Sequence, residues 1–182
     1  MSEIKTPPHS LEAEKSVIGA VLIDRDAVVA VIEVLEAEHF YNPKHQSIYA
    51  AVVDLYRERE PVDIVTVAEK LKSKKELEEI GGMDYLKSLV SGVPTSAHAV
   101  SYAQSVKDMF TKRLMISAAA EINTLAFDDS ADIRQILDQA EGKVFALAQR
   151  HLKQVFVPVK DILDESFDRL DELHKSAGSL RG

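Results

Sequence analysis

The chain has 182 residues, of which 46% are hydrophobic and 29% charged, a composition typical of a globular protein that can bury a core. Its formal net charge of −8, without any stripe of Lys and Arg, argues against direct binding of nucleic acid through phosphate contacts. The lack of Cys excludes disulfides and thiolate chemistry, and the lack of a signal peptide or of roughly 18 consecutive apolar residues predicts a cytoplasmic protein outside the membrane.

A bundle of short helices is predicted for the first half of the chain. Ser10 and Asp26 are typical N-cap residues, and Asn42 followed by Pro43 is the expected pairing of N-cap and first helical residue. Glu14 fits the positive end of the first helix. The predicted helices span about residues 10–23, 26–35, 43–58, 63–71 and 83–91. We therefore expect a globular helical subdomain over residues 1–95.

Two long proline-free segments follow, and we predict that they form a helical hairpin over residues 96–150, with Ser96 as its N-cap. The first helix rises to about Leu125, and the second returns from about Ala131 to Arg150. The return helix carries one apolar stripe of helical period, which a single partner surface can cover. The stripe consists of Ile133, Ile136, Leu137, Ala140, Val144 and Leu147.

The rising helix is apolar around most of its circumference from Leu114 to Leu125, which is more than one partner helix can cover. A helix of about 30 residues is about 45 Å long and exceeds the width of a small domain, so it should project. Either an identical hairpin of another subunit or the N-terminal half of the chain can cover the surplus, and periodicity leaves both open. The predicted oligomer interface consists of Leu114, Met115, Ala118, Ala119, Ile122, Leu125, Val144 and Leu147.

Residues 151–158 are predicted to form an extended linker that ends at Pro158, and residues 159–182 a last helix with a short tail. The helix is amphipathic, but the domain before it offers no evident groove for its apolar face. We therefore expect another surface to bind that face, which consists of Ile162, Leu163, Phe167, Leu170 and Leu173.

No pattern in the sequence carries catalytic chemistry. The only Gly-Lys pair, Gly142-Lys143, lacks the glycine and hydroxyl residue of a phosphate loop. Glu36 and His39 have the Glu-x-x-His spacing of di-iron bundles, but such sites need facing copies and further carboxylates, so surface polar residues are the favoured interpretation. Asp171 and His174 only imitate a second copy. The remaining histidines, which suggest no triad and are expected to be structural or exposed, include His9, His45, His98 and His151.

Several short motifs follow one another along the chain. They include Pro8-His-Ser-Leu-Glu12-Ala-Glu14, His39-Phe40-Tyr41, Pro61-Val62-Asp63, Gly81-Gly82 with Tyr85-Leu86, Val93-Pro94-Thr95, Arg113 before Met115-Ile116, Glu121-Ile122, and Ala140-Glu141 before Val144-Phe145. Each is weak alone, but the ordered set covers essentially the whole chain. It resembles the N-terminal domain and linker helix of the bacterial replicative DNA helicases of the DnaB family.

The resemblance implies an all-α domain of a hexameric ring that unwinds DNA at the replication fork. Its RecA-like motor, with ATP and Mg, would follow Gly182, so this chain would lack Walker A, bind no cofactor or metal, and reach DNA only through the full ring. The family's N-terminal domains pair through their hairpins and form a collar as a trimer of dimers. The linker helix packs on the motor of the neighbouring subunit.

The collar of that family also docks the C-terminal domain of primase in the primosome. By motif position, Tyr85, Ile116 and Ile122 correspond to primase contacts, and a helicase loader is a further expected partner. For Ile116 and Ile122 the alternative is burial in the hairpin or dimer seam. Two other classes stay open at this point: a helical adaptor unrelated to a motor, which a Walker A sequence after Gly182 in the gene would exclude, and a helical metalloenzyme, which metal analysis would test.

Overall fold

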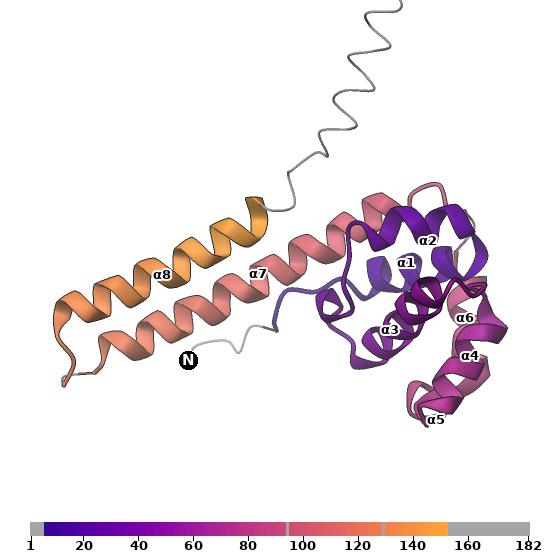
Figure 1. Ribbon diagram of the computed structural model, residues 1–182, viewed down its shortest axis with the longest axis horizontal. Coiled ribbons are helices and arrows are strands. Elements are labelled where there is room, and N and C mark those ends of the chain that lie inside the picture. Colours follow the sequence, from indigo (N-terminus) through magenta and orange to yellow (C-terminus); the bar gives the residue numbers. More distant parts are fainter. Residues whose placement is uncertain (1–5, 94, 129, 153–182) are drawn as a thin grey trace, which may run out of the picture. The chain divides into compact units, whose positions relative to one another are not determined.

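The computed structural model describes residues 6–93, 95–128 and 130–152, and every regular element within these ranges is a helix (Figure 1). The chain divides into two compact units, residues 1–129 and 130–182, and each is described by itself. The elements are α1 (Leu11–Ile23), α2 (Arg25–Ile32), η1 (Ala37–His39), α3 (Pro43–Glu58), α4 (Ile64–Ser73), α5 (Leu77–Ile80), α6 (Gly82–Ser91), α7 (Ala99–Ala126) and α8 (Ile133–Leu152). The predicted all-α class is confirmed, as are the short helices followed by two long ones.

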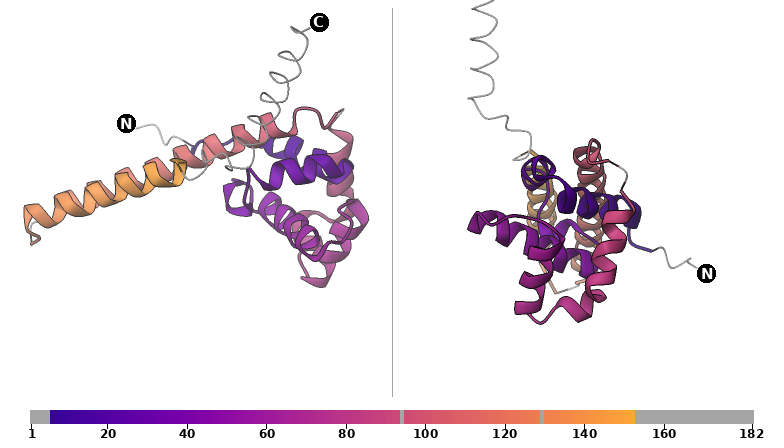
Figure 2. Two further views of the ribbon diagram at one scale, coloured as in Figure 1. Left: turned by 45° about the horizontal axis from the view of Figure 1, so that its top comes forward. Right: turned by 90° about the vertical axis from the view of Figure 1, so that its right-hand side faces the viewer.

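Helix α1 is the centre of the bundle that α1 to α6 form with the beginning of α7, and it packs against α2, α3, α6 and α7 (Figure 2). Its buried side chains surround the helix, as expected of a helix inside a core. At Gly19, an added Cβ would lie 2.5 Å from the Leu89 carbonyl oxygen and 2.5 Å from a Val93 methyl group. The missing side chain thus lets α6 approach α1 closely.

Two of the predicted N-caps are confirmed by their hydrogen bonds. The Ser10 hydroxyl accepts from the Ala13 backbone N–H at 3.3 Å, and the Asn42 side chain accepts from the Lys44 N–H at 3.0 Å. Helix α3 begins at Pro43, because proline has a fixed φ and needs no hydrogen-bond partner for its nitrogen. These local patterns determine where α1 and α3 start.

Two other predicted caps are wrong. Asp24, not Asp26, caps α2 by accepting from the Asp26 N–H at 2.9 Å, and α2 ends at Ile32 rather than Leu35. Ser96 caps no helix, since its hydroxyl donates instead to the Asp24 carboxylate. This hydrogen bond lowers the pKa of Asp24 and joins the segment before α7 to the corner between α1 and α2.

Helix α7 has 28 residues and is about 42 Å long, and all of its buried residues lie in its first third. Its buried residues are Ala99, Ala103, Val106 and Lys107, and none of residues 108–126 is buried. We call residues 108–126 distal α7. The bundle therefore does not cover the apolar circumference, and the predicted projection of this helix is confirmed.

Arg113 fixes the direction in which distal α7 leaves the bundle. Its guanidinium donates to the carbonyl oxygens of Pro8 and His39, both at 2.8 Å, and lies over the Tyr41 ring at 5.6 Å. One cation thus joins α7 to the segment before α1 and to η1.

Helix α8 forms part of the second unit and runs through Leu152, two residues into the predicted linker. The rest of the predicted linker and the helix predicted after it lie outside the described residues, and the pairing of α7 with α8 in a hairpin stays a prediction. No helix in the described ranges is long and apolar enough to cross a membrane.

Candidate functional site

A buried carboxylate lies at the junction of α1 and α3. Glu14 of α1 is almost completely buried, and its oxygens accept from the backbone N–H groups of Tyr41 at 2.6 Å and Asn42 at 3.3 Å. His45 of α3, fully buried, places Nδ1 2.6 Å from the same carboxylate. A buried charge requires such partners, since its desolvation is otherwise costly.

The chain of hydrogen bonds continues from His45 to Tyr85 of α6. His45 Nε2 lies 2.8 Å from the Tyr85 hydroxyl oxygen. With the Nδ1 proton directed to Glu14, the Nε2 lone pair of a neutral imidazole accepts from the phenol, whereas an imidazolium would donate to the phenol oxygen. Burial, and then the charge of Glu14, raise the pKa of Tyr85, so the hydroxyl keeps its proton. Three helices thus meet through one polar network.

The ring of Tyr85 has a defined place between two elements and remains half-buried. Gly81 adopts φ +108°, and a Cβ there would lie 3.2 Å from the Tyr85 Cβ, so glycine serves both the backbone turn and the close approach. The Lys44 ammonium lies 5.4 Å from the centre of the Tyr85 ring, within the range of a cation–π contact. Tyr85, Lys44 and Gly81 form what we call the Tyr85 face.

His45 was expected from the sequence to be either structural or exposed, and it is structural. The role of Glu14 as its buried partner was missed. A signal was present, because Glu14 lies three and four residues before Val17 and Ile18 and seven before Val21, on the apolar stripe of α1. A carboxylate within such a stripe indicates a buried polar partner.

Glu36 and His39, which have the spacing of metal ligands, form a local cap instead. His39 Nδ1 accepts from the Glu36 backbone N–H at 3.0 Å, and the imidazole lies against the Phe110 ring with centroids 4.7 Å apart. The prediction of surface polar residues is wrong for His39, which is buried. Asp171 and His174 lie outside the described residues, and among those described no group of three or more His, Asp or Glu residues is arranged to bind a metal ion.

The predicted oligomer interface is only partly covered within the described residues. Of its eight residues none is buried: Leu114, Ala118, Ile122, Leu125 and Leu147 are half-buried, and Met115 (57%), Ala119 and Val144 (56%) are exposed. The alternative in which the N-terminal half of the chain folds over this surface is therefore wrong for the residues described.

Distal α7 presents two apolar faces. Ile122 shares a half-buried stripe with Leu114, Ala118 and Leu125, at spacings of four, four and three residues. Ile116 is 55% exposed and lies six residues before Ile122, which places the two side chains about 120° apart around the helix. The predicted primase contacts are therefore not gathered in one patch: Tyr85 lies on α6, and Ile116 and Ile122 lie on different sides of α7.

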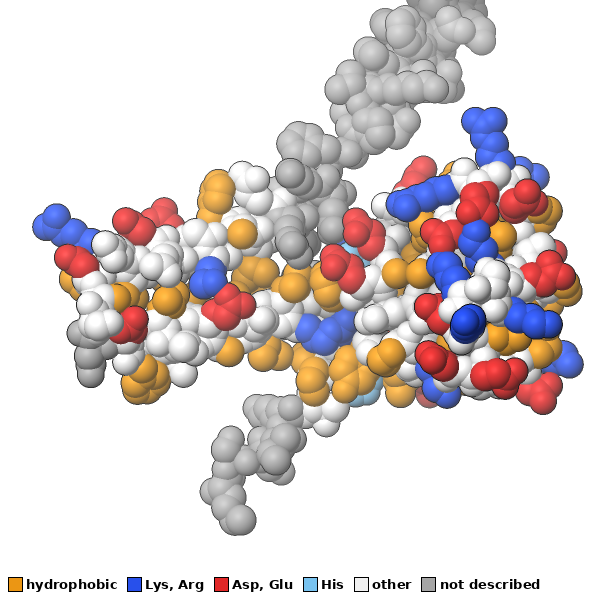
Figure 3. Space-filling model, turned by 60° about the horizontal axis from the view of Figure 1, so that its bottom comes forward, with side chains coloured by type: hydrophobic (Ala, Val, Ile, Leu, Met, Phe, Trp, Pro, Cys, Tyr) orange, Lys and Arg blue, Asp and Glu red, His pale blue; other side chains and the backbone are white. Residues whose placement is uncertain are grey.

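Helix α8 also leaves apolar side chains uncovered. Leu137 (61%), Ile133, Val144 and Phe145 are each more than half exposed, and the covering of this helix's stripe by one partner surface stays a prediction. A shallow hollow of about 570 Å³ lies between side chains of α8, mostly apolar, from Leu137 to Ala148. In Figure 3, charged side chains crowd the bundle and are sparser over the long helices, where hydrophobic side chains reach the surface.

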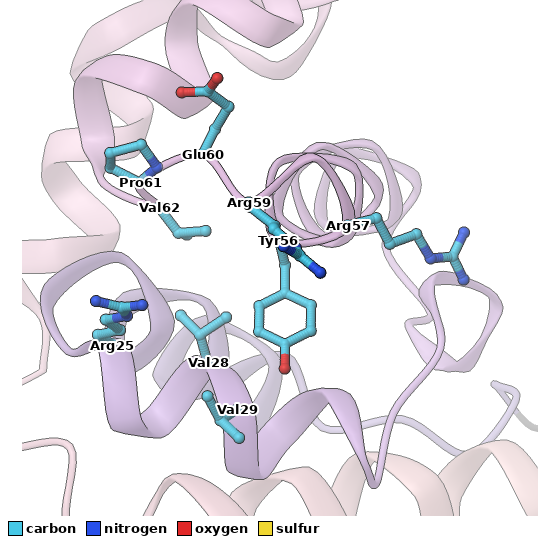
Figure 4. Close-up of a pocket in the computed structure, with 9 residues that line it drawn as sticks. All are labelled: Arg25, Val28, Val29, Tyr56, Arg57, Arg59, Glu60, Pro61 and Val62. Carbon is cyan, nitrogen blue, oxygen red and sulfur yellow. The ribbon is translucent and has the colours of Figure 1, made fainter.

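A second hollow, of about 730 Å³, lies between α2 and the end of α3 (Figure 4). Val28, Val29 and Tyr56 form its apolar side, and the guanidinium of Arg57 points away from it. Tyr56 is 11 residues after His45, which is about 16 Å along α3, so this hollow lies apart from the Tyr85 face. None of the residues predicted from sequence as functional lines it.

The five apolar residues of the predicted linker helix, Ile162 to Leu173, lie outside the described residues. Their docking on a neighbouring motor therefore stays a prediction.

Comparisons with known proteins bear on the identity of the fold. Residues 6–108 match the model of the DnaB-like helicase N-terminal domain. The chain is 38% identical to the replicative DNA helicase DnaB of Geobacillus stearothermophilus over 100% of its own length and 41% of that protein, and 37% identical to that of Mycobacterium leprae over 98% and 30%. It thus spans well under half the length of these relatives.

Solved structures agree with this match. The crystal structure of the N-terminal domain of DnaB helicase from Mycobacterium tuberculosis aligns with a TM-score of 0.74 and 38% identity, covering 78% of this chain and 99% of that one. A DnaB-like replicative helicase, described with its interactions with primase, has the same fold, with a TM-score of 0.63 and 24% identity over 86% of this chain and 34% of that one. Family match, sequence identity and fold agree, and the chain belongs to the family of DnaB-like helicase N-terminal domains.

Proposed function

We propose that this chain is the N-terminal collar domain of a hexameric replicative helicase, joining subunits through its long helices and docking primase at the replication fork. The observation that carries the proposal is the set of apolar side chains on distal α7 and on α8, each of which is exposed or only half-buried in the described chain. Monomeric proteins rarely expose large apolar patches, so a second chain is the expected cover of each helix. Family membership makes an identical subunit the natural candidate.

The parent protein would unwind DNA in the cytoplasm, at the nucleoid, by ATP hydrolysis in a motor domain after Gly182. That motor, with ATP and Mg, would perform the chemistry, and this chain would contribute assembly and recognition. The relatives are named replicative DNA helicases, which supports this division of roles. The linker helix would pack on the motor of the neighbouring subunit, and a helicase loader would be a further partner of the ring.

The two apolar faces of distal α7 suggest two partners. Ile122 would lie in the seam of a dimer with Leu114, Ala118 and Leu125, and three such dimers would form the collar. Ile116, about 120° away around the helix from Ile122, would contact the C-terminal domain of primase together with Tyr85. The relative described with its interactions with primase supports primase as a partner of this fold.

Two substitutions on distal α7, each expected to affect a different measurement, test whether its two apolar faces bind two different partners. Ile122→Asp should lower the mass measured by sedimentation across a concentration series, because it places an unpaired charge in the seam. Ile116→Asp should leave that mass unchanged and weaken binding of the primase C-terminal domain by roughly tenfold or more in calorimetry. If both variants assemble and bind primase as the wild type does, the proposed collar function is wrong.

A further inference from the structure

We propose that a partner binds the Tyr85 face by contacting the aromatic ring and the Lys44 ammonium. It does not contact the phenol hydroxyl, which points inward to His45. The face would then bind a segment that presents an apolar side chain beside a carboxylate. This inference rests on the proposed docking of primase at Tyr85 and specifies the chemistry of that contact.

The hydroxyl is already engaged. It lies 2.8 Å from His45 Nε2, inside a network that Glu14 completes on the far side of the imidazole. In either protonation state of His45 the phenol has a hydrogen-bond partner within the chain. A partner that bonded this hydroxyl would have to displace a buried histidine, whereas the exposed part of the ring is accessible without any rearrangement.

Lys44 is the charged group beside that ring. Its side chain is exposed, with Nζ 5.4 Å from the ring centre, and no carboxylate of the described residues forms a salt bridge with it. Lys44 is also the second residue of α3, where the helix dipole disfavours a cation. The lysine therefore contributes little to the helix that carries it, while its charge is available to a carboxylate of a partner.

The Tyr85 ring and Lys44 are held in a fixed relation. The hydrogen bond from Tyr85 to His45 joins α6 to α3, one residue after Lys44, and Gly81 closes the other side of the tyrosine at φ +108°. A contact surface that is ordered before binding loses less conformational entropy when the partner arrives. The network of Glu14 and His45 thus positions the ring without touching the partner.

The first experiment compares Tyr85→Phe with Tyr85→Ala in the whole chain, measuring the affinity for the primase C-terminal domain and the urea midpoint of unfolding. Tyr85→Phe should keep the affinity within about twofold and lower the urea midpoint, because His45 Nε2 loses its partner. Tyr85→Ala should lower the affinity by roughly tenfold or more, because the ring is removed. Loss of affinity in Tyr85→Phe with an unchanged urea midpoint would show that the hydroxyl is the contact and overturn the inference.

The second experiment tests the charge. Lys44→Glu should weaken binding by roughly tenfold and make it less sensitive to salt, and Lys44→Met should do so to a smaller extent. Lys72 is an exposed lysine of α4 that forms no salt bridge with the described residues, so Lys72→Glu is the matched control and should bind as the wild type does. If Lys44→Glu binds as tightly as the wild type at low salt while Tyr85→Ala binds weakly, the partner places no carboxylate at Lys44 and this inference is overturned, but the docking at Tyr85 stands. If Tyr85→Ala itself binds normally, the proposed docking at Tyr85 fails and this inference fails with it.

Discussion

The polar side chains inside the bundle are paired residue by residue. Among the described residues, no buried side-chain nitrogen or oxygen lacks a hydrogen-bond partner. Glu14, His45 and His39 each bond to groups on other elements or to the backbone. Removing one partner would leave another buried group unsatisfied, which costs more free energy than the hydrogen bond itself contributes. These three residues are therefore sensitive positions.

The first prediction concerns the pH dependence of stability at His39. Burial lowers the pKa of His39 below its ordinary value of 6.5, and the positive charges of Lys107 and Arg113 act in the same direction, against Glu36 and Glu38. The unfolded chain then binds the proton more readily than the folded one. The free energy of unfolding should be highest above pH 6.5 and fall at lower pH, by at most about 1.4 kcal/mol per pH unit for one proton.

Urea unfolding at several pH values measures this slope. His39→Asn is the matched variant, because an amide oxygen can accept from the Glu36 N–H as Nδ1 does but does not titrate. The variant should show a shallower loss of stability between pH 7 and pH 5. An identical slope in the two proteins would show that His39 does not carry the effect.

At the scale of elements, helix starts with a local signal could be predicted and contacts between distant residues could not. Ser10 and the Asn42-Pro43 pair lie next to the helices that they start, so the sequence alone indicates them. Asp24 caps α2 and also accepts from the Ser96 hydroxyl, 72 residues away, a contact that no local pattern indicates. The partners Glu14 and His45 are 31 residues apart. Propensity and periodicity carry no information on such separations, and so the network behind Tyr85 was missed.

The second prediction concerns the crossing of α1 and α6. Gly19→Ala should destabilise the chain by roughly 2 kcal/mol, because the new methyl group meets the Leu89 carbonyl, a backbone atom that cannot rotate away. Gly142→Ala of α8 is the matched control, since no atom lies within 4 Å of its added Cβ. At that position the same exchange should stabilise the helix by about 1 kcal/mol, because alanine has a higher helix propensity than glycine. Urea unfolding followed by circular dichroism compares the two, and equal stability of Gly19→Ala and wild type would contradict the close packing.

At the scale of the whole molecule, apolar side chains that the chain does not bury are present on both long helices, as the sequence predicts for the first of them. The apolar run from Leu114 correctly indicated a helix that the bundle does not cover. The stripe of α8 was expected to be covered by one partner surface. Leu137 and Val144 are exposed in the described chain, and that cover stays a prediction. Periodicity identifies an apolar face, but the number of surfaces that cover it depends on chains that the sequence does not describe.

The last prediction tests whether that surface joins two chains. Ala119→Arg should lower self-association, because a seam would bury its charge without a partner. Ala119 is exposed within the chain, so the fold itself should change by no more than about 0.5 kcal/mol. Ser101→Arg, an exposed position on the bundle end of the same helix, should leave association unchanged. Sedimentation across a concentration series measures the association of both variants. If a folded Ala119→Arg variant associates as strongly as Ser101→Arg, distal α7 is not part of the interface.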